Sequence, residues 1–434
     1  MKRGFYTIMS AQFFSSLADN ALFVAAVELL RTGGAPEWQR AALVPMFALF
    51  YVILAPFVGA FADALPKGKV MFVSNAIKIV GCLMMLFGSH PLMAYAVVGL
   101  GAAAYSPAKY GILTELLPAS QLVKANGWIE GLTITSIILG VLLGGQLVGA
   151  SISHSLLAID LPLIDTGIDT APEAAIASLI IVYIVAAWFN TRIPHTGVEM
   201  RPLRQDPERS VLSNALALVP DFWTCNRRLW KDRLGQISLS TTTLFWGVSG
   251  NLRYIVLAWG GVALGYSTTQ ASALVGVVAI GTAVGAVVAS MRMRLDVATR
   301  VMPMGIAMGV LVVLMNFISN VWVAVPFLIL LGGLGGFLVV PMNALLQHRG
   351  HNLMGSGRSI AVQNFNEQAC ILALGAFYSL STRLGLSAFG AITVFGIVVA
   401  SIMWLIQRWH AYNCVHHSEE VEHLLHIARQ DTHH

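Results

Sequence analysis

The chain has 434 residues, of which 56% are hydrophobic and only 11% are charged. Soluble proteins carry about 25% charged residues, so this composition excludes an ordinary soluble domain. The four cysteines lie in separate segments without paired or metal-type spacing, and no phosphate-binding glycine loop is present. These features predict an all-α integral membrane protein without a disulfide framework, a cofactor or ATP as its energy source.

Apolar segments of about 20 residues, enough to cross a bilayer as a helix, fill nearly the whole length. Polar residues interrupt the first of them, and no clear small-x-small cleavage site follows, so we expect a retained helix and not a signal peptide. Twelve spans are predicted, at residues 5–30, 41–62, 70–88, 92–114, 125–150, 174–191, 235–259, 269–290, 299–318, 321–346, 358–382 and 386–407.

A long polar segment divides these spans six and six. We therefore expect an N-terminal half at 1–191, a cytoplasmic central loop at 192–234, a C-terminal half at 235–408 and a cytoplasmic tail at 409–434. The amphipathic piece from Val211 to Trp230 is expected to lie along the inner leaflet, which attracts basic segments.

The basic residues indicate the orientation of the spans. With the N-terminus in the cytoplasm, 21 of the 26 Lys and Arg residues fall in inner loops, inner span ends and tails. The outer side holds Arg31, Arg40 and Arg383, while Lys78 and Arg253 remain inside spans. Both termini are therefore predicted to be cytoplasmic, and this placement explains the net charge of +5 without a nucleic-acid partner.

The two halves repeat features at matching positions. Pro107 and Lys109 near the end of span 4 match Pro341 and Asn343 near the end of span 10, and Asn20 of span 1 matches an asparagine of span 7, Asn251. Paired halves with interruptions at matching positions are typical of transporters whose site lies near the middle of the membrane.

The loop after span 2 reads GAFADALPKGK from residue 59 to residue 69. It resembles the G-x-x-x-D-x-x-G-R/K loop motif of the major facilitator superfamily, although Pro66 replaces the second glycine. Gly59 would permit close helix packing, and Asp63 could face the positive N-terminus of a helix in the other half. Lys67 and Lys69 are the basic residues of the motif.

Arg358, at the start of span 11, is a second expected partner of Asp63. Gly59, Asp63, Lys67 and Arg358 together are interpreted as an inner gate. The alternative is an ordinary charged turn.

Two charges lie at a similar depth in the spans that begin the two halves. Asp19, next to Asn20 in span 1, and Arg253 in span 7 would each be costly in lipid, and much less so if they faced each other. We interpret them as an ion pair across the halves that breaks and forms during transport. A permanent structural pair is the alternative.

A second polar cluster is expected nearer the cytoplasm. Lys109 is either part of this site or reaches back to the interface along its apolar stem, which is the alternative. A cavity with cationic and amide donors suits a zwitterionic or anionic head group, and the apolar spans suit an acyl chain. The cluster comprises Lys109, Tyr110 and Glu130 from the first half and Asn343, Gln363, Asn364 and Glu367 from the second.

The segments LADNALF, GAAAYSPAKYGILTEL, LVKANG, TLFWG, VVPMNALLQ and AVQN resemble the bacterial lysophospholipid transporter family, a branch of the major facilitator superfamily. The resemblance covers nearly the whole chain except residues 151–173 and the His-rich tail. It implies twelve transmembrane helices in two six-helix halves. It also implies a transporter of the bacterial inner membrane that flips lysophosphatidylethanolamine from the outer to the inner leaflet, with lysophosphatidylglycerol as a second candidate substrate.

The same resemblance implies an acyltransferase partner, which we expect to be a separate cytoplasmic-side protein because only about 25 residues follow span 12. It also marks Asp19, Lys109, Arg253 and Glu367 as polar residues of the pathway. Three other functions are less consistent with the sequence. A proton-coupled exporter of amphipathic drugs is disfavoured because Lys109 and Arg253 would repel a cationic drug. A membrane acyltransferase is disfavoured because no histidine lies beside an acid within a span. A structural protein without transport would not explain the paired charges.

Overall fold

The computed structural model describes residues 3–116, 119–159, 165–200, 202, 206–354 and 356–432. Side chains at 3, 114, 119–127, 130, 356–357 and 431–432 are outside this description, and among them is that of Glu130. The described residues form helices and no strand, as the composition predicts.

Contacts between helices divide the chain into two compact units. The first comprises Met1–Leu218 with Tyr266–Gly276, and the second comprises Val219–Gly265 with Val277–His434. The helices up to residue 216 are α1 Arg3–Thr32, α2 Glu37–Ile53, α3 Ala55–Ala64, α4 Lys67–Leu86, α5 Pro91–Leu116, α6 Ala119–Leu147, α7 Ala150–Leu157, α8 Ala171–Thr191 and α9 Val211–Leu216.

The remaining elements, from α10 onward, belong mainly to the second unit. The exceptions are the first residue of α10 and the start of α12, which belong to the first unit. The remaining elements are α10 Leu218–Lys231, α11 Gly235–Ala263, α12 Thr268–Arg292, η1 Leu295–Val301, α13 Met302–Leu314, η2 Met315–Phe317, α14 Val321–Met354, α15 Ser356–Arg383, α16 Ala388–His416 and α17 Ser418–Thr432.

The helices account for the twelve spans. Seven stretches of the described residues are long and apolar enough to cross a membrane, and two more spans are helix pairs bent by 65°. The other three are α5, α11 and α15, which have 26, 29 and 28 residues.

The sequence predicts one helix at 41–62 for span 2, and the structure corrects this prediction. The helix breaks at Leu54, so that α2 and α3 form one of the bent pairs. Pro56 lies in the first turn of α3. Proline has no amide hydrogen and its ring blocks the preceding turn, which explains why α2 does not continue through this point.

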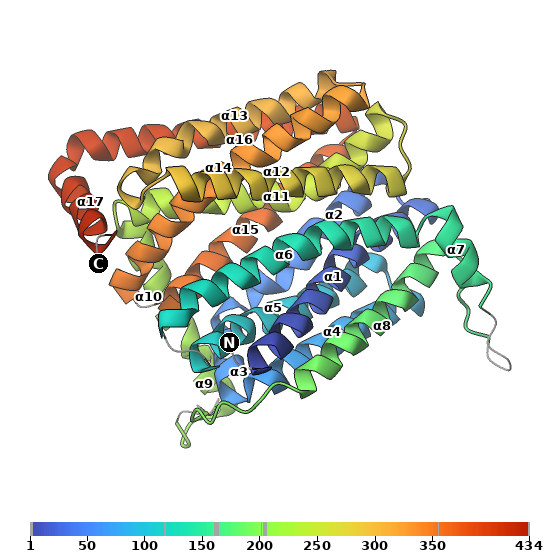
Figure 1. Ribbon diagram of the computed structural model, residues 1–434, viewed down its shortest axis with the longest axis horizontal. Coiled ribbons are helices and arrows are strands. Elements are labelled where there is room, and N and C mark those ends of the chain that lie inside the picture. The colour runs from blue at the N-terminus through green and yellow to red at the C-terminus, as the bar shows by residue number, and fades with distance from the viewer. Residues whose placement is uncertain are drawn as a thin grey trace. The chain divides into compact units, whose positions relative to one another are not determined.

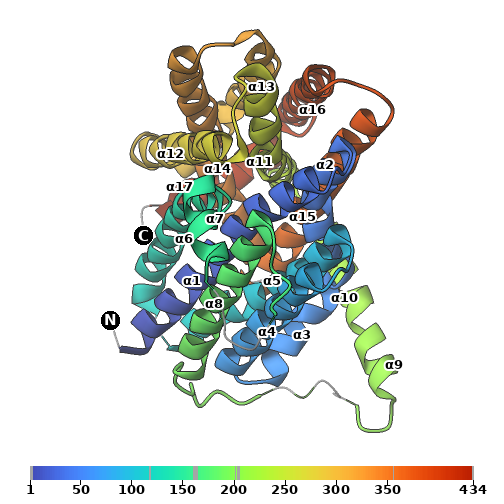
Figure 2. The same ribbon diagram turned by 90° about the vertical axis from the view of Figure 1, so that its right-hand side faces the viewer.

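Each unit repeats the same arrangement of neighbouring helices. In the first unit α1 packs against α6 and α8, and α4 packs against α5 and α8 (Figure 1). In the second, α11 packs against α15 and α16, and α13 packs against α14 and α16 (Figure 2). The matching asparagines repeat a bond as well, because Asn20 Nδ2 donates to the Ser16 carbonyl and Asn251 Nδ2 to the Gly247 carbonyl, each at 2.8 Å.

The second half of the polar segment 192–234 packs against helix α15. Phe222 of α10 meets Phe365 edge to face at 5.2 Å, and Asn366 donates a 2.8 Å hydrogen bond to Asn226. Val211 and Leu212 of α9 are 63% and 69% exposed. The amphipathic piece is therefore two helices, and its contact with the inner leaflet stays a prediction.

Candidate functional site

A lysine lies buried in the middle of the apolar first unit. Lys78 of α4 is 2% exposed, and its ammonium donates hydrogen bonds to Asp19 Oδ2 at 2.8 Å and to Ser15 Oγ at 2.9 Å. Tyr183 of α8 donates a 2.6 Å hydrogen bond to the other oxygen, Asp19 Oδ1. Helices α1, α4 and α8 thus bring one charged pair together, and the Asp19 side chain keeps 21% of its surface exposed.

Two aromatic rings lie beside the same ammonium group, and an amide binds the hydroxyl that accepts from it. Lys78 Nζ lies 5.1 Å from the ring centroid of Tyr105 and 5.7 Å from that of Tyr183, at distances where a cation is attracted to the ring face. Ser15 in turn donates a 2.7 Å hydrogen bond to the fully buried Asn75. This network holds a positive charge where lipid alone could not solvate it.

The second unit holds an amide cluster near the start of α15. Gln363 Nε2 donates to Asn343 Oδ1 of α14 at 2.5 Å and to Glu367 Oε1 at 2.8 Å. Gln363 and Glu367 are 7% and 8% exposed. Three of the site residues that the sequence predicts are thus in direct contact, while Asn364 lies half-buried on the same helix.

Two other predicted site residues are basic side chains, one in each unit. Lys109 of α5 is half-buried, and its ammonium lies 4.4 Å from the ring centroid of the next residue, Tyr110. Arg253 is half-buried on α11. Asp19 and Arg253 belong to different units, so their pairing stays a prediction.

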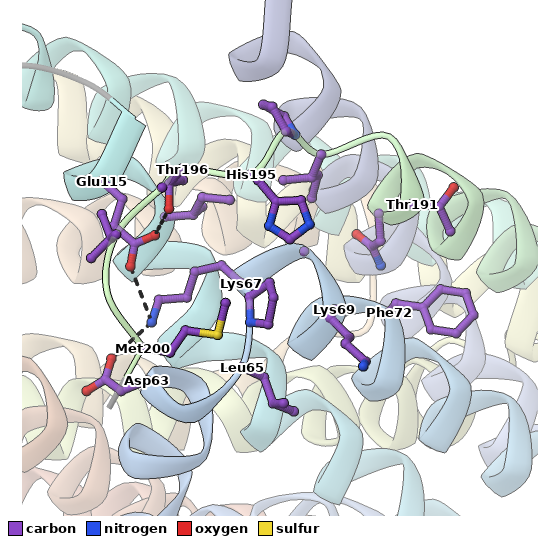
Figure 3. Close-up of a pocket in the computed structure, with 18 of the residues that line it drawn as sticks. Asp63, Leu65, Lys67, Lys69, Phe72, Glu115, Thr191, His195, Thr196 and Met200 are labelled. Atoms are coloured by element: carbon purple, nitrogen blue, oxygen red, sulfur yellow. Dashed lines mark hydrogen bonds and ion pairs between the residues drawn. The ribbon is translucent and has the colours of Figure 1, made fainter. Parts of the chain in front are cut away.

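The predicted loop motif lies at the end of α3 and the start of α4, where Lys67 stands between two acids (Figure 3). Lys67 is 7% exposed, and its ammonium lies 2.9 Å from Asp63 Oδ1 and 3.5 Å from Glu115 Oε1 of α5. Lys67 also donates to the Ala62 carbonyl at 2.8 Å, and Thr196 donates to Glu115 Oε2 at 2.7 Å. The acid and base of the loop motif therefore pair with each other within the first unit.

Arg358, the other partner expected for Asp63, belongs to the second unit. Its guanidinium lies 3.9 Å from Asp221 of α10, and both side chains are more than half exposed. Gly59 has open space on its Cα, because a Cβ added there would meet nothing within 4 Å. The structure therefore shows no close contact at Gly59 among the described residues, and both its packing role and the Asp63–Arg358 pairing stay predictions.

Sequence reasoning assigned no role to Lys78, Tyr183 or Ser15. Lys78 gave the clearest signal, because it is one of two basic residues inside predicted spans. A charge at that depth indicates a functional site by itself. Tyr183 and Ser15 gave no comparable signal, because isolated hydroxyl side chains are common in apolar helices.

Comparison with known proteins gives these clusters a context. A family model described as Major Facilitator Superfamily matches residues 8–372. Proteins named "Lysophospholipid transporter LplT" from Yersinia pestis and Yersinia pseudotuberculosis are 39% identical to the chain over 386 residues, which is 89% of this chain and 88% of theirs.

Solved structures share the fold at low sequence identity. A bacterial homologue of the human lysosomal transporter Spinster aligns with a TM-score of 0.65 and 16% identity, covering 95% of this chain and 99% of its own. The nucleoside transporter NupG aligns with a TM-score of 0.65 and 12% identity, covering 94% and 99%. These likenesses concern the fold alone, and they confirm the predicted two-half, twelve-helix class.

Proposed function

This chain belongs to the lysophospholipid transporter family of the major facilitator superfamily, and we propose that it moves lysophospholipids, chiefly lysophosphatidylethanolamine, across a membrane. The observation that carries this proposal is the buried pair of Lys78 and Asp19 in the middle of an apolar helix bundle. The relatives at 39% identity are named for lysophospholipids, so a drug-exporter function is not favoured.

Lys78 has the chemistry to bind a lipid phosphate. An ammonium is a compact point charge that suits phosphate oxygens, and here it is held by one carboxylate, one hydroxyl and two aromatic rings. An incoming phosphate can take the place of Asp19 on Lys78, and the released carboxylate can accept from the ammonium of an ethanolamine head group. A zwitterionic head group therefore matches both members of the pair.

The amide cluster of the second unit provides further polar positions. Gln363 Nε2 and Glu367 are already within hydrogen-bonding distance, so a head group that displaces Gln363 meets a carboxylate and an amide oxygen. We assign Asn20, Lys109, Tyr110, Glu130, Arg253 and Asn364 to the transport pathway as proposals that rest on their position in the spans.

Several finer points belong to the same proposal. We place this multi-pass membrane protein in the bacterial inner membrane with both termini cytoplasmic, because the basic residues gather on one side. Transport would run from the outer to the inner leaflet, where a separate acyltransferase restores the second chain. Asp63, Lys67 and Arg358 would gate the cytoplasmic side.

Uptake of radiolabelled lysophosphatidylethanolamine tests this proposal. Spheroplasts that lack a resident lysophospholipid transporter would express the full chain or its Lys78→Met variant, at equal membrane levels. We expect uptake with the full chain and little with the variant. Two-chain phosphatidylethanolamine serves as the control lipid. Equal uptake of lysophosphatidylethanolamine with and without the full chain would refute the proposal.

A further inference from the structure

A cavity of about 720 Å³ opens in the first unit, where α4 begins and α8 ends. The first turn of α4, the last residues of α8 and the chain from Ile193 to Met200 form its walls. In Figure 3 the side chains of Lys67, Lys69, His195 and Thr196 surround it. None of the transport residues assigned above, apart from Asp63 and Lys67, lines this cavity.

The N-terminus of α4 faces the cavity without a side-chain cap. Residues 66–69 line the cavity, and Pro66 occupies the N-cap position and makes no cap hydrogen bond. The helix is 20 residues long, so its first amides carry the partial positive charge of a full helix dipole. Such an end binds anions, phosphates above all.

A buried amide provides the second indication of a ligand. Asn190 of α8 lines the cavity, is only 2% exposed, and has no hydrogen-bond partner for Oδ1 or Nδ2 among the described residues. Its backbone carbonyl lies 3.2 Å from where a Cβ on Gly68 would stand, so it adjoins the first turn of α4. A buried polar group without a partner is unfavourable, and a ligand that forms hydrogen bonds with it would remove that cost.

One of the cavity's two lysines remains available for a ligand. Lys67 is bound by Asp63 and Glu115. Lys69 is exposed, and it lines the cavity together with the exposed His195 and Glu199. An anion at the α4 N-terminus would therefore meet Lys69, while Glu199 offers a counter-charge for the cationic end of a zwitterion.

The cavity also has an apolar rim. Phe72 of α4, Val198 and Met200 line it and are 41%, 50% and 46% exposed. Exposed apolar side chains beside a polar cavity are what an amphiphile with a charged head and acyl chains would contact.

We propose that this cavity binds a phosphate group, which would lie on the N-terminus of α4, Lys69 and Asn190. The phosphate belongs either to the head group of a phospholipid in the adjacent leaflet or to a soluble anion. The site is separate from the Asp19–Lys78 pair, and it stands whether or not the transported substrate is a lysophospholipid.

Calorimetric titration of the detergent-purified full chain tests the site with two probes, dihexanoyl phosphatidylglycerol and inorganic phosphate. Lys69→Gln and Asn190→Leu should each weaken binding by about tenfold, as the loss of one hydrogen bond to a charged group predicts. Lys231→Gln, at an exposed lysine of α10, and Asn413→Leu, at another buried and unpartnered asparagine, should bind as the wild type does.

The two probes distinguish the source of the phosphate. Binding of the short-chain lipid alone identifies a lipid head group, and equal binding of inorganic phosphate identifies a soluble anion. No binding of either probe, unchanged binding in Lys69→Gln, or an equal loss in the control variants would overturn the proposal. Lys69 is exposed, so its substitution leaves folding intact even if that of Asn190 does not.

Discussion

Lys78 of α4 and Asp19 of α1 form an ion pair with 2.8 Å between Nζ and Oδ2, although 59 residues of chain separate them. Each charge alone in a bilayer would be strongly unfavourable. The pair therefore fixes how α1 and α4 pack, and it leaves a carboxylate partly accessible for transport.

The first prediction separates the structural role of this pair from its role in transport. Lys78→Met leaves the partly buried Asp19 without its cation, which should destabilise the fold by up to about 3–5 kcal/mol and lower the melting temperature of the purified protein. The double variant Asp19→Leu with Lys78→Met removes both charges and should regain most of that stability. Lysophospholipid uptake should stay absent, so a double variant with normal uptake would contradict a binding role.

The second prediction concerns Arg253. If it meets Asp19 during transport, the effects of Asp19→Ala and Arg253→Ala should be clearly non-additive, since residues in contact couple by about 0.5–3 kcal/mol. Uptake and disulfide cross-linking between cysteines placed at the outer ends of α1 and α11 are the two readouts. Additivity in both would mean that the two charges never meet.

The third prediction concerns Lys67 as a support of the inner gate. Lys67→Met leaves Asp63 and Glu115 near each other without a cation, so the end of α5 should loosen. A cysteine replacing Ile112, which is 1% exposed and lines the cavity, should then react faster with a water-soluble maleimide.

Arg192→Gln provides a local control for this experiment. Arg192 is exposed at the same end of the bundle, where its guanidinium lies 4.9 Å from the Trp188 ring, and it does not contact the two acids. Its variant should leave the labelling rate unchanged. Equal labelling in Lys67→Met and wild type would rule out a gating role for Lys67.

The fourth prediction concerns stability at the start of α11. Arg349 of α14 binds both oxygens of Asp232, at 2.7 Å and 3.0 Å, and Asp232 also accepts from the Gly235 amide at 2.8 Å. The two side chains are 6% and 8% exposed. Because lysine cannot form this bidentate ion pair, Arg349→Lys should lower the melting temperature almost as much as Arg349→Met.

An exposed pair supplies the comparison for Arg349. Arg209 lies 3.3 Å from Asp206, with side chains 60% and 48% exposed, and exposed pairs contribute little. Arg209→Lys should therefore leave the melting temperature unchanged. A similar shift of the melting temperature in Arg349→Lys and Arg209→Lys would show that the bidentate geometry of Arg349 does not contribute to stability.

The sequence by itself determined the membrane class, the twelve spans and the repeat of the halves. These follow from local properties, because a bilayer demands a run of apolar residues for each crossing and internal hydrogen bonds in each helix. The contact between Gln363 and Glu367 was also predictable from the sequence, since residues four apart share one face of a helix.

Only the tertiary structure decided which polar groups meet. Asp19 could have paired with any buried cation as far as the sequence shows, and the structure gives it Lys78 and Tyr183, from two other helices. The reason is physical: a hydrogen bond between helices depends on how each helix is rotated and how far it is shifted along its neighbour. Those quantities come from packing of the whole bundle, and no local pattern along the chain encodes them.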